Sequence, residues 1–211
     1  MTMTLYCFGE SGNAYKAALM LAVTGLLWTP RFVDFFNGET RTPAYRALNA
    51  MGEVPLLVDG DVTLGQSGAI LLHLAAKTGR FGGATTALQS DILRWILFDN
   101  HKVSGMAGIV RFQMNFLPPD RRNPDVIAFL SARLTGALTV LESHLAQTEW
   151  LAGDSPTVAD FSNCGYLYYP EQFGFDRAAW PAIDRWLTRI AALPGWAHPY
   201  DLMPGNPADR A

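Results

Sequence analysis

The spacing of apolar positions changes along the first 77 residues, with short strand-like runs separating stretches of helical periodicity. Residues 5–8 and 28–35 are strand-like, and residues 13–23, apolar almost all round, predict a helix buried on both sides. Parallel strands need a right-handed crossover, and the intervening helix supplies it. The pattern predicts one βαβ unit.

A polar, irregular connection over residues 37–49 leads to a predicted hairpin. Residues 54–58 and 62–64 flank Asp59-Gly60, a dipeptide that favours the positive φ angles of a tight turn. From Ser67 onward apolar residues recur at helical density. We therefore predict an α/β domain with a small four-stranded mixed sheet and the order βαβ, loop, ββα.

A glycine-containing stretch at residues 78–86 interrupts this pattern and marks a predicted domain boundary. The α/β domain then occupies residues 1–78, and an all-helical domain occupies residues 87–197. Residues 198–211 show no periodicity and predict a loose or wrapping tail.

The all-helical domain begins with a predicted helix over residues 87–116 that ends at Pro118-Pro119. Asn123 caps a second helix, with Pro124 at its first position, and this helix should pack antiparallel to the first. Its predicted buried stripe consists of Ile127, Leu130, Leu134, Leu138, Leu141 and Leu145.

Two more helices complete the predicted domain. Residues 157–160 resemble a capping box with Asp in place of the usual Glu or Gln, and Pro181 begins the last helix. The residues of that helix expected to face inward are Ile183, Trp186, Leu187 and Ile190.

Hydrophobic residues make up 49% of the 211 residues and charged residues 17%, a combination that excludes intrinsic disorder. The formal net charge is −3 and the longest basic run is Arg121-Arg122, which argues against a nucleic-acid partner. The longest unbroken apolar stretch, residues 17–23, is far shorter than the ~20 residues of a membrane span. No secretory signal is visible, so we expect a protein that neither spans a membrane nor is secreted.

The cysteines Cys7 and Cys164 lie far apart, without a CxxC motif or the spacing of metal ligands. This predicts reduced thiols in a cytoplasmic protein and neither a disulfide nor a metal site, with Cys7 a small hydrophobe buried in a strand. The histidines show no spacing typical of a base or a ligand, and we interpret them as structural or surface residues: His73, His101, His144 and His198.

Three segments of the first domain have features of a ligand site, and each has a simpler structural alternative. Residues 9–13 bring N–H groups together at a helix N-terminus, an arrangement that favours binding of an anion. The simpler alternative is that Ser11 only caps this helix. Pro55 opens a strand, either as an ordinary start or after a cis bond that would expose the Val54 main chain to an extended peptide. Residues 65–68 begin a helix that could hold a carboxylate or simply be capped.

Together, the order and spacing of these segments resemble the N-terminal domain of cytosolic glutathione transferases. The resemblance rests on residues 11–16 (SGNAYK), 49–57 (NAMGEVPLL) and 64–70 (LGQSGAI), which look most like the bacterial Ser/Asn-type classes. Residues 150–153 (WLAG) and 157–160 (TVAD) resemble the capping motif of the family's second domain. The resemblance implies a thioredoxin-like domain that binds glutathione as co-substrate, without a metal, and an all-helical domain that completes an apolar pocket.

Residue roles follow from the same resemblance. Ser11 matches the hydroxyl that donates to the glutathione sulfur, with Asn13 as a second or rival donor. Val54, before a cis Pro55, matches the main-chain clamp on the cysteinyl unit. The residues that match the grip on the γ-glutamyl end are Gln66 and Ser67.

Two positions depart from the family pattern. Ala50 stands where members usually carry Pro, and Glu53 stands where they often carry Lys, Arg or Gln near the glycine carboxylate of glutathione. A like charge at Glu53 would repel that carboxylate, unless Arg41 or Lys16 compensates. Because position 11 is Ser rather than Cys, exchange through a protein thiol is disfavoured.

We expect the small apolar electrophile to bind against the turn at residues 9–10 and the middle of the long helix, at Met106, Ile109 and Phe112, although such residues at helical spacing also suit a core. The predicted function is a detoxifying glutathione transferase, and the resemblance implies a homodimer. The alternatives are a non-catalytic binding or interaction module, which Glu53 favours, and a glutathione-dependent isomerase or reductase that uses the same thiolate.

Overall fold

The computed structural model describes residues 2–205 and contains two compact units. The first unit consists of residues 2–82 together with residues 193–205, and the second consists of residues 83–192. The last part of the predicted tail, residues 206–211, lies outside the described residues.

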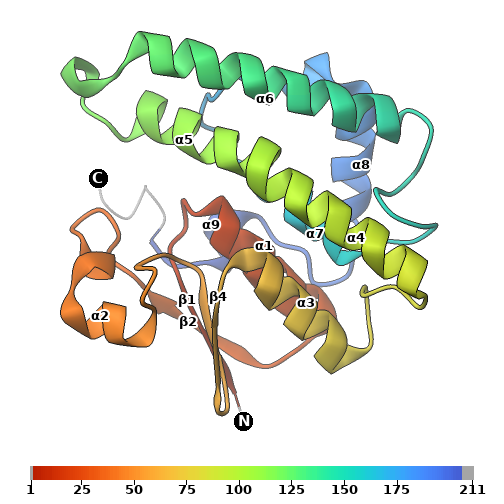
Figure 1. The fold of residues 1–211 in the computed structure, drawn as a ribbon, viewed down its shortest axis with the longest axis horizontal. Helices are drawn as coiled ribbons and strands as arrows, with labels where there is room; N and C mark the ends of the chain where they lie inside the picture. Colours follow the sequence, from red (N-terminus) through yellow and green to blue (C-terminus); the bar gives the residue numbers. More distant parts are fainter. Residues whose placement is uncertain (1, 206–211) are drawn as a thin grey trace. The chain divides into compact units, whose positions relative to one another are not determined.

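The first unit contains the mixed four-stranded sheet that the sequence predicts, in the order β2-β1-β3-β4 (Figure 1). β1 (Met3–Cys7) pairs in parallel with β2 (Trp28–Phe32) and antiparallel with β3 (Leu56–Asp59), which forms a hairpin with β4 (Val62–Gly65). β2 is an edge strand, which is where a strand tolerates a proline such as Pro30.

Two helices, α1 (Gly12–Thr24) and α3 (Ser67–Thr78), pack together on one side of this sheet (Figure 1). α1 is buried along almost its whole length, as its all-round apolar pattern predicts, and even Lys16 has no exposed surface. The β1–α1–β2 crossover therefore places the N-terminus of α1 directly after the carboxyl end of β1.

The polar connection between β2 and β3 is more ordered than the sequence predicts. It contains η1 (Glu39–Arg41) and the six-residue helix α2 (Pro43–Leu48), and β2 ends at Phe32, three residues before the predicted end. A helix this short shows no periodicity, but its start signal is present in the sequence, since Thr42 caps it ahead of a proline at its first position.

The second unit is helical, as predicted. The long helix expected over residues 87–116 is formed by α4 (Thr86–Phe98), η2 (Asp99–Val103) and α5 (Ser104–Asn115) in direct succession. The central segment η2 is a turn of π-helix. There the buried carboxylate of Asp99 accepts hydrogen bonds from the hydroxyls of Ser104 at 2.6 Å and Ser162 at 2.7 Å.

α6 (Pro124–Leu145) follows the short η3 (Pro119–Arg121) and packs along α5 (Figure 1). Asn123 caps it as predicted. Of the predicted stripe, the four residues from Leu134 onward are buried, whereas Ile127 and Leu130 are half-buried. By length and composition alone α6 qualifies as a membrane span, a test that core helices of soluble proteins also pass.

The later helices of the second unit are α7 (Val158–Asn163), η4 (Arg177–Ala179) and α8 (Pro181–Ala191). The capping box at the start of α7 is present: Asp160 accepts from the amide of Thr157 at 2.8 Å and also from the indole of Trp186 at 2.8 Å. Burial raises the pKa of the Asp160 carboxyl, while these donors oppose the rise. The predicted inward-facing residues of α8 are buried.

The described segment that follows α8 returns to the first unit instead of trailing away from it. Residues 193–205 belong to that unit and contain the short helix α9 (Pro199–Leu202), which packs against α1. Tyr15 on α1 donates its hydroxyl proton to the carbonyl of Ala197 at 3.0 Å. The described part of the predicted tail is therefore a wrapping segment.

Candidate functional site

The segment between β1 and α1 is a tight turn held at two points. The amide of Ser11 donates to the carbonyl of Phe8 at 3.0 Å, which closes the turn around Gly9 and Glu10. The amide of Gly9 donates to the carbonyl of Pro204 at 2.7 Å. The turn is thus fixed both by its own chain and by the segment that returns from the C-terminal end.

Ser11 is the N-cap of α1, and its hydroxyl oxygen accepts from the amide of Ala14 at 3.1 Å. A serine hydroxyl has two acceptor lone pairs and one donor proton, so this bond fixes the oxygen without using the proton. The two interpretations of Ser11, helix cap and donor to an anion, are therefore chemically compatible.

Asn13 and Ser67 begin two different helices, α1 and α3, and the structure brings their side chains together. The Ser67 hydroxyl donates to Oδ1 of Asn13 at 3.5 Å. The N-termini of both helices carry unpaired amides and partial positive charge. Their meeting point is suited to a ligand with more than one anionic group.

The loop before β3 presents its main chain in a fixed conformation. The Val54–Pro55 peptide bond is cis. The carbonyl of the preceding Glu53 accepts from the Tyr45 hydroxyl at 2.9 Å and from the Asn49 side chain at 2.8 Å. Within residues 2–205 the main-chain amide and carbonyl of Val54 have no hydrogen-bond partner, so they are available to a ligand.

Glu53 and Gln66 contact each other at the surface of this unit. Gln66 donates from its side-chain amide to the Glu53 carboxylate at 2.9 Å and to the sulfur of Met51 at 3.2 Å. Gln66 precedes α3 with a φ of 66°, a left-handed conformation uncommon outside glycine. Gln66, expected to bind the γ-glutamyl end of glutathione, therefore lies next to Glu53, the carboxylate that departs from the family pattern.

The cation beside this loop is one that the sequence did not indicate. Of the two cations expected to compensate Glu53, Lys16 is fully buried in α1, and Arg41 is exposed at the end of η1. Arg46 on α2 instead lies against the loop: its guanidinium nitrogen is 3.3 Å from where a Cβ on Gly52 would stand, and it donates to the Ala50 carbonyl at 3.4 Å. Arg46 and Tyr45 were missed because α2 itself was not predicted.

Both cysteines are buried free thiols. Burial raises the pKa of the Cys7 thiol to about 12, so it carries no thiolate near neutral pH. Among residues 2–205 no group of three or more histidine, cysteine or acidic side chains is arranged to hold a metal ion.

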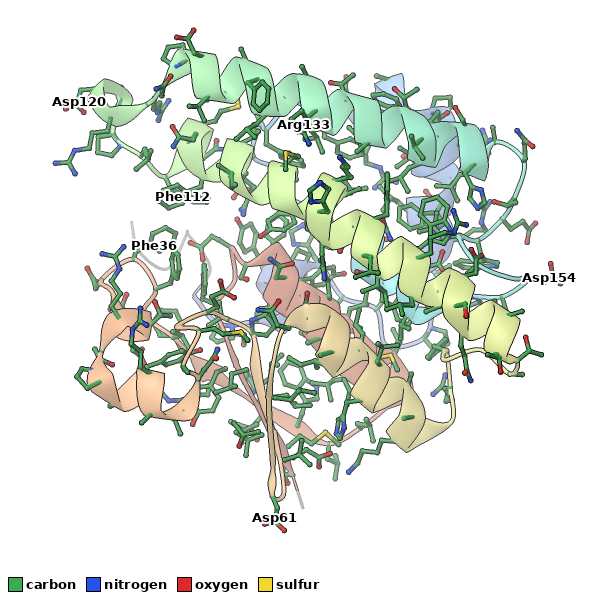
Figure 2. The ribbon with its side chains drawn as sticks, in the orientation of Figure 1. Phe36, Asp61, Phe112, Asp120, Arg133 and Asp154 are labelled. Carbon is green, nitrogen blue, oxygen red and sulfur yellow. The ribbon has the colours of Figure 1, made fainter. Side chains whose placement is uncertain are left out.

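The predicted lining of the electrophile pocket consists of the turn at residues 9–10 in the first unit and three residues of α5 in the second unit. Ile109 is 48% exposed, whereas Met106 and Phe112, the latter labelled in Figure 2, are half-buried. Next to them Gly108 faces the Tyr166 ring, whose hydroxyl is 2.9 Å from where a Cβ would stand. α5 thus offers apolar surface at these positions, and the pocket itself stays a prediction.

The comparisons with known proteins point to one family. The family model "Glutathione S-transferase, N-terminal domain" matches residues 1–76, and "Glutathione S-transferase, C-terminal domain" matches residues 114–194. Glutathione S-transferase 3 of Zea mays is 32% identical over 92% of this chain and 91% of its own. Maleylacetoacetate isomerase of Pseudomonas aeruginosa is 31% identical over 98% of this chain and 100% of its own.

Solved structures agree with this assignment. A glutathione S-transferase from Xanthobacter autotrophicus has a TM-score of 0.87 and 33% identity over 99% of both chains. A glutathione transferase from Burkholderia graminis, solved with two glutathione molecules bound per subunit, has a TM-score of 0.82 and 26% identity over 92% of this chain and 85% of its own. The chain, with a thioredoxin-like first domain and a helical second domain, belongs to the cytosolic glutathione transferase family.

Proposed function

We propose that this protein is a glutathione S-transferase that keeps the thiol of glutathione ionised for attack on a small apolar electrophile. A free thiol, with a pKa near 8.5, is only a few per cent ionised at pH 7, and the thiolate is the nucleophile. The protein must therefore lower that pKa, and each unit of lowering corresponds to about 1.36 kcal/mol of preference for the charged form.

Ser11 carries this proposal. Its oxygen is fixed by the Ala14 amide at 3.1 Å, and its proton stays available at the N-terminus of α1. A hydroxyl donor and a helix N-terminus both favour a negative sulfur. Asn13 is the second donor, because its amide nitrogen remains when Ser67 approaches its oxygen.

The tripeptide backbone would bind along the same unit. The unpartnered main chain of Val54 suits an antiparallel pair of hydrogen bonds with the cysteinyl residue, with Pro55 closing that loop. Gln66 and Ser67, at the start of α3, would bind the γ-glutamyl end. Glu53 lies beside Gln66 and would weaken the hold on the nearest carboxylate of glutathione.

In the reaction the sulfur lone pair attacks the electrophilic carbon, the new S–C bond forms, and the leaving group departs with its electron pair. Ser11 keeps its own proton throughout and stabilises the sulfur only while that atom is negative. The apolar surface of Met106, Ile109 and Phe112 would orient the electrophile. We further propose that the enzyme works as a cytoplasmic homodimer in detoxification.

The experiment is a calorimetric titration with glutathione, paired with the ultraviolet absorbance of the bound thiolate as a function of pH. Binding together with a thiol pKa below that of free glutathione supports the proposal. Binding with an unchanged thiol pKa would instead identify a non-catalytic binding module. A lack of binding at millimolar glutathione would favour an interaction module that does not use glutathione.

A second candidate is glutathione-dependent isomerisation, favoured by the match to maleylacetoacetate isomerase over the whole length of that relative. The same thiolate would add to a conjugated double bond, allow rotation about the resulting single bond, and be eliminated again. Turnover of a cis-unsaturated diketo acid without net consumption of glutathione would identify this activity.

A further inference from the structure

The segment of residues 195–205, which we name the C-terminal strap, runs beside α1 from its last turn to its first. Near Gly195, a Cβ would stand 2.5 Å from the carbonyl of Ala22, close to the C-terminal end of α1. Ala197 accepts from Tyr15 in the first half of that helix, and Pro204 accepts from Gly9, ahead of the helix. The strap therefore ends at the turn that carries Ser11.

Gly9 is where the strap contacts this turn most closely. Besides the 2.7 Å hydrogen bond from its amide to Pro204, a Cβ at this position would lie 3.2 Å from the Gly205 carbonyl and 3.2 Å from the Tyr200 ring. These distances are tighter than ordinary van der Waals contact. Gly9 therefore leaves room for the strap.

The strap side of this contact is ordered by its own interactions. The amide of Tyr200 donates to Nδ1 of His198 at 3.3 Å, and the two rings lie 5.6 Å apart between centroids. Pro199 and Met203 are buried. Tyr200 and the Pro204 carbonyl thus present a fixed surface to Gly9.

Because Gly9 and Glu10 are the central residues of the turn closed by the Ser11 amide and the Phe8 carbonyl, the position of Gly9 sets the position of Ser11. We propose that the C-terminal strap is a positioning element for the reaction: through Pro204 and Tyr200 it fixes the turn so that the Ser11 hydroxyl points its proton at the glutathione sulfur. This inference rests on the proposed function.

The test uses two pairs of variants. A chain that ends after Ala197 loses the strap beyond the Tyr15 contact, whereas a chain that ends after Gly205 keeps all of it. Gly9→Ala forces the Gly205 carbonyl or the Tyr200 ring to shift by a few tenths of an ångström without shortening the chain. Its control is Gly136→Ala, since a Cβ at Gly136 on α6 would meet nothing within 4 Å.

The readout is the pKa of the bound glutathione thiol. We expect the chain ending after Ala197 and Gly9→Ala to raise it by about one unit, a tenfold loss of thiolate well below the pKa. At acidic pH, where the thiol is protonated in every variant, glutathione affinity should change little. The chain ending after Gly205 and Gly136→Ala should match the parent protein in both measurements.

The outcomes separate this inference from the proposed function. If the parent protein does not lower the thiol pKa, the proposed function fails. If it does, and Gly9→Ala folds with an unchanged thiol pKa, the strap has no positioning role and only the inference is overturned. Circular dichroism of each variant shows whether it is folded. If the chain ending after Ala197 does not fold, the thiol pKa measured with Gly9→Ala alone decides whether the strap positions Ser11.

Discussion

The hydroxyl of Ser67 lies 3.5 Å from the amide oxygen of Asn13, although the two residues are 54 positions apart in the sequence. Each residue sits in the first turn of its helix, α1 or α3, so the contact joins two helix N-termini whose partial positive charge favours an anion. A ligand with both a carboxylate and a thiolate can use the two ends at once, which matches the chemistry of glutathione.

Ser11→Ala removes the hydroxyl proton proposed to stabilise the thiolate. We expect the pKa of bound glutathione to rise by about one to two units, with conjugation near neutral pH falling by a similar factor of ten or more. Loss of the helix cap should also lower the free energy of unfolding by about 1 kcal/mol. Thiolate absorbance against pH and urea unfolding measure the two effects separately.

Thr85→Ala is the matched control for that change, since Thr85 caps α4 through the Leu88 amide at 3.2 Å and belongs to the second unit. It should cost about 1 kcal/mol of stability and leave the thiol pKa unchanged. If Ser11→Ala leaves the pKa unchanged as well, Asn13 is the dominant donor, and Asn13→Ala should then produce the shift.

Glu53→Gln removes a negative charge and keeps an oxygen that can accept the hydrogen bond from Gln66. We expect the dissociation constant of glutathione to fall by about two- to fivefold at low salt, because the repulsion acts at an exposed position. The gain should shrink as salt is added. Calorimetric titration at two ionic strengths measures it.

Asp61→Asn, at the tip of the β3–β4 hairpin (Figure 2), changes the net charge of the same unit by the same amount. It should leave glutathione affinity as it is. Equal tightening in both variants would mean that net charge, and not the place of Glu53 beside Gln66, sets the affinity.

Asp59 on β3 predicts a pH dependence of stability. Lys77, at 2.8 Å, and His73, at 2.9 Å, hold the pKa of this carboxyl below its ordinary value of 3.8. A lowered folded-state pKa contributes stability that is complete above the unfolded-state value and is lost as the pH falls through the folded-state value. Asp59→Asn should therefore be destabilising at pH 7, with the difference from the parent shrinking below about pH 4 in urea unfolding.

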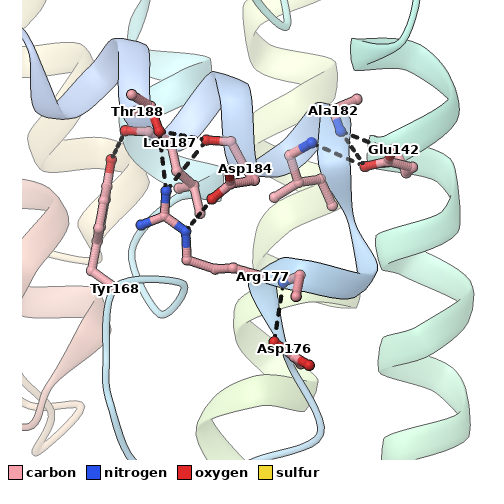
Figure 3. Close-up of polar contacts among 10 residues, drawn as sticks. Glu142, Tyr168, Asp176, Arg177, Ala182, Asp184, Leu187 and Thr188 are labelled. Carbon is pink, nitrogen blue, oxygen red and sulfur yellow. Dashed lines mark hydrogen bonds and ion pairs between the residues drawn. The ribbon is translucent and has the colours of Figure 1, made fainter.

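Glu142 on α6 caps the start of α8 from a distance of 40 residues along the chain (Figure 3). Its carboxylate accepts from the amides of Ala182 at 2.9 Å and Ile183 at 2.9 Å, directly after Pro181, which has no amide proton. Glu142→Ala leaves these donors without that partner and should cost about 1–2 kcal/mol. Exposed Glu149→Ala should cost almost nothing in the same urea measurement.

The sequence predicted the sheet, the order of its strands along the chain and the long helices, because each has a periodic pattern or a cap. The exceptions are short or interrupted elements. α2 has only six residues, too few for a helical period to be recognised. The π-helical turn at Asp99–Val103 lies between two α-helices in direct succession, so the sequence reads as one continuous helix there.

The site was less accessible to prediction. Ser11, Gln66 and Ser67 are marked by their places at helix starts, but the contact of Ser67 with Asn13 depends on how α1 and α3 pack. The Tyr45 hydroxyl donates to the Glu53 carbonyl, and the Arg46 guanidinium donates to the Ala50 carbonyl. A single sequence contains no pattern that indicates such contacts between a side chain and the main chain of a loop. The same holds for the hydrogen bond from Gly9 to Pro204.

The return of residues 193–205 to the first unit also has a consequence for biosynthesis. The ribosome makes residues 2–82 well before it makes the segment that lies along α1, with the whole second unit in between. Domains usually fold in the order in which they emerge. Here the nascent first unit lacks residues 193–205 until the second unit has been made, so a chain that stops before them lacks the hydrogen bond from Gly9 to Pro204.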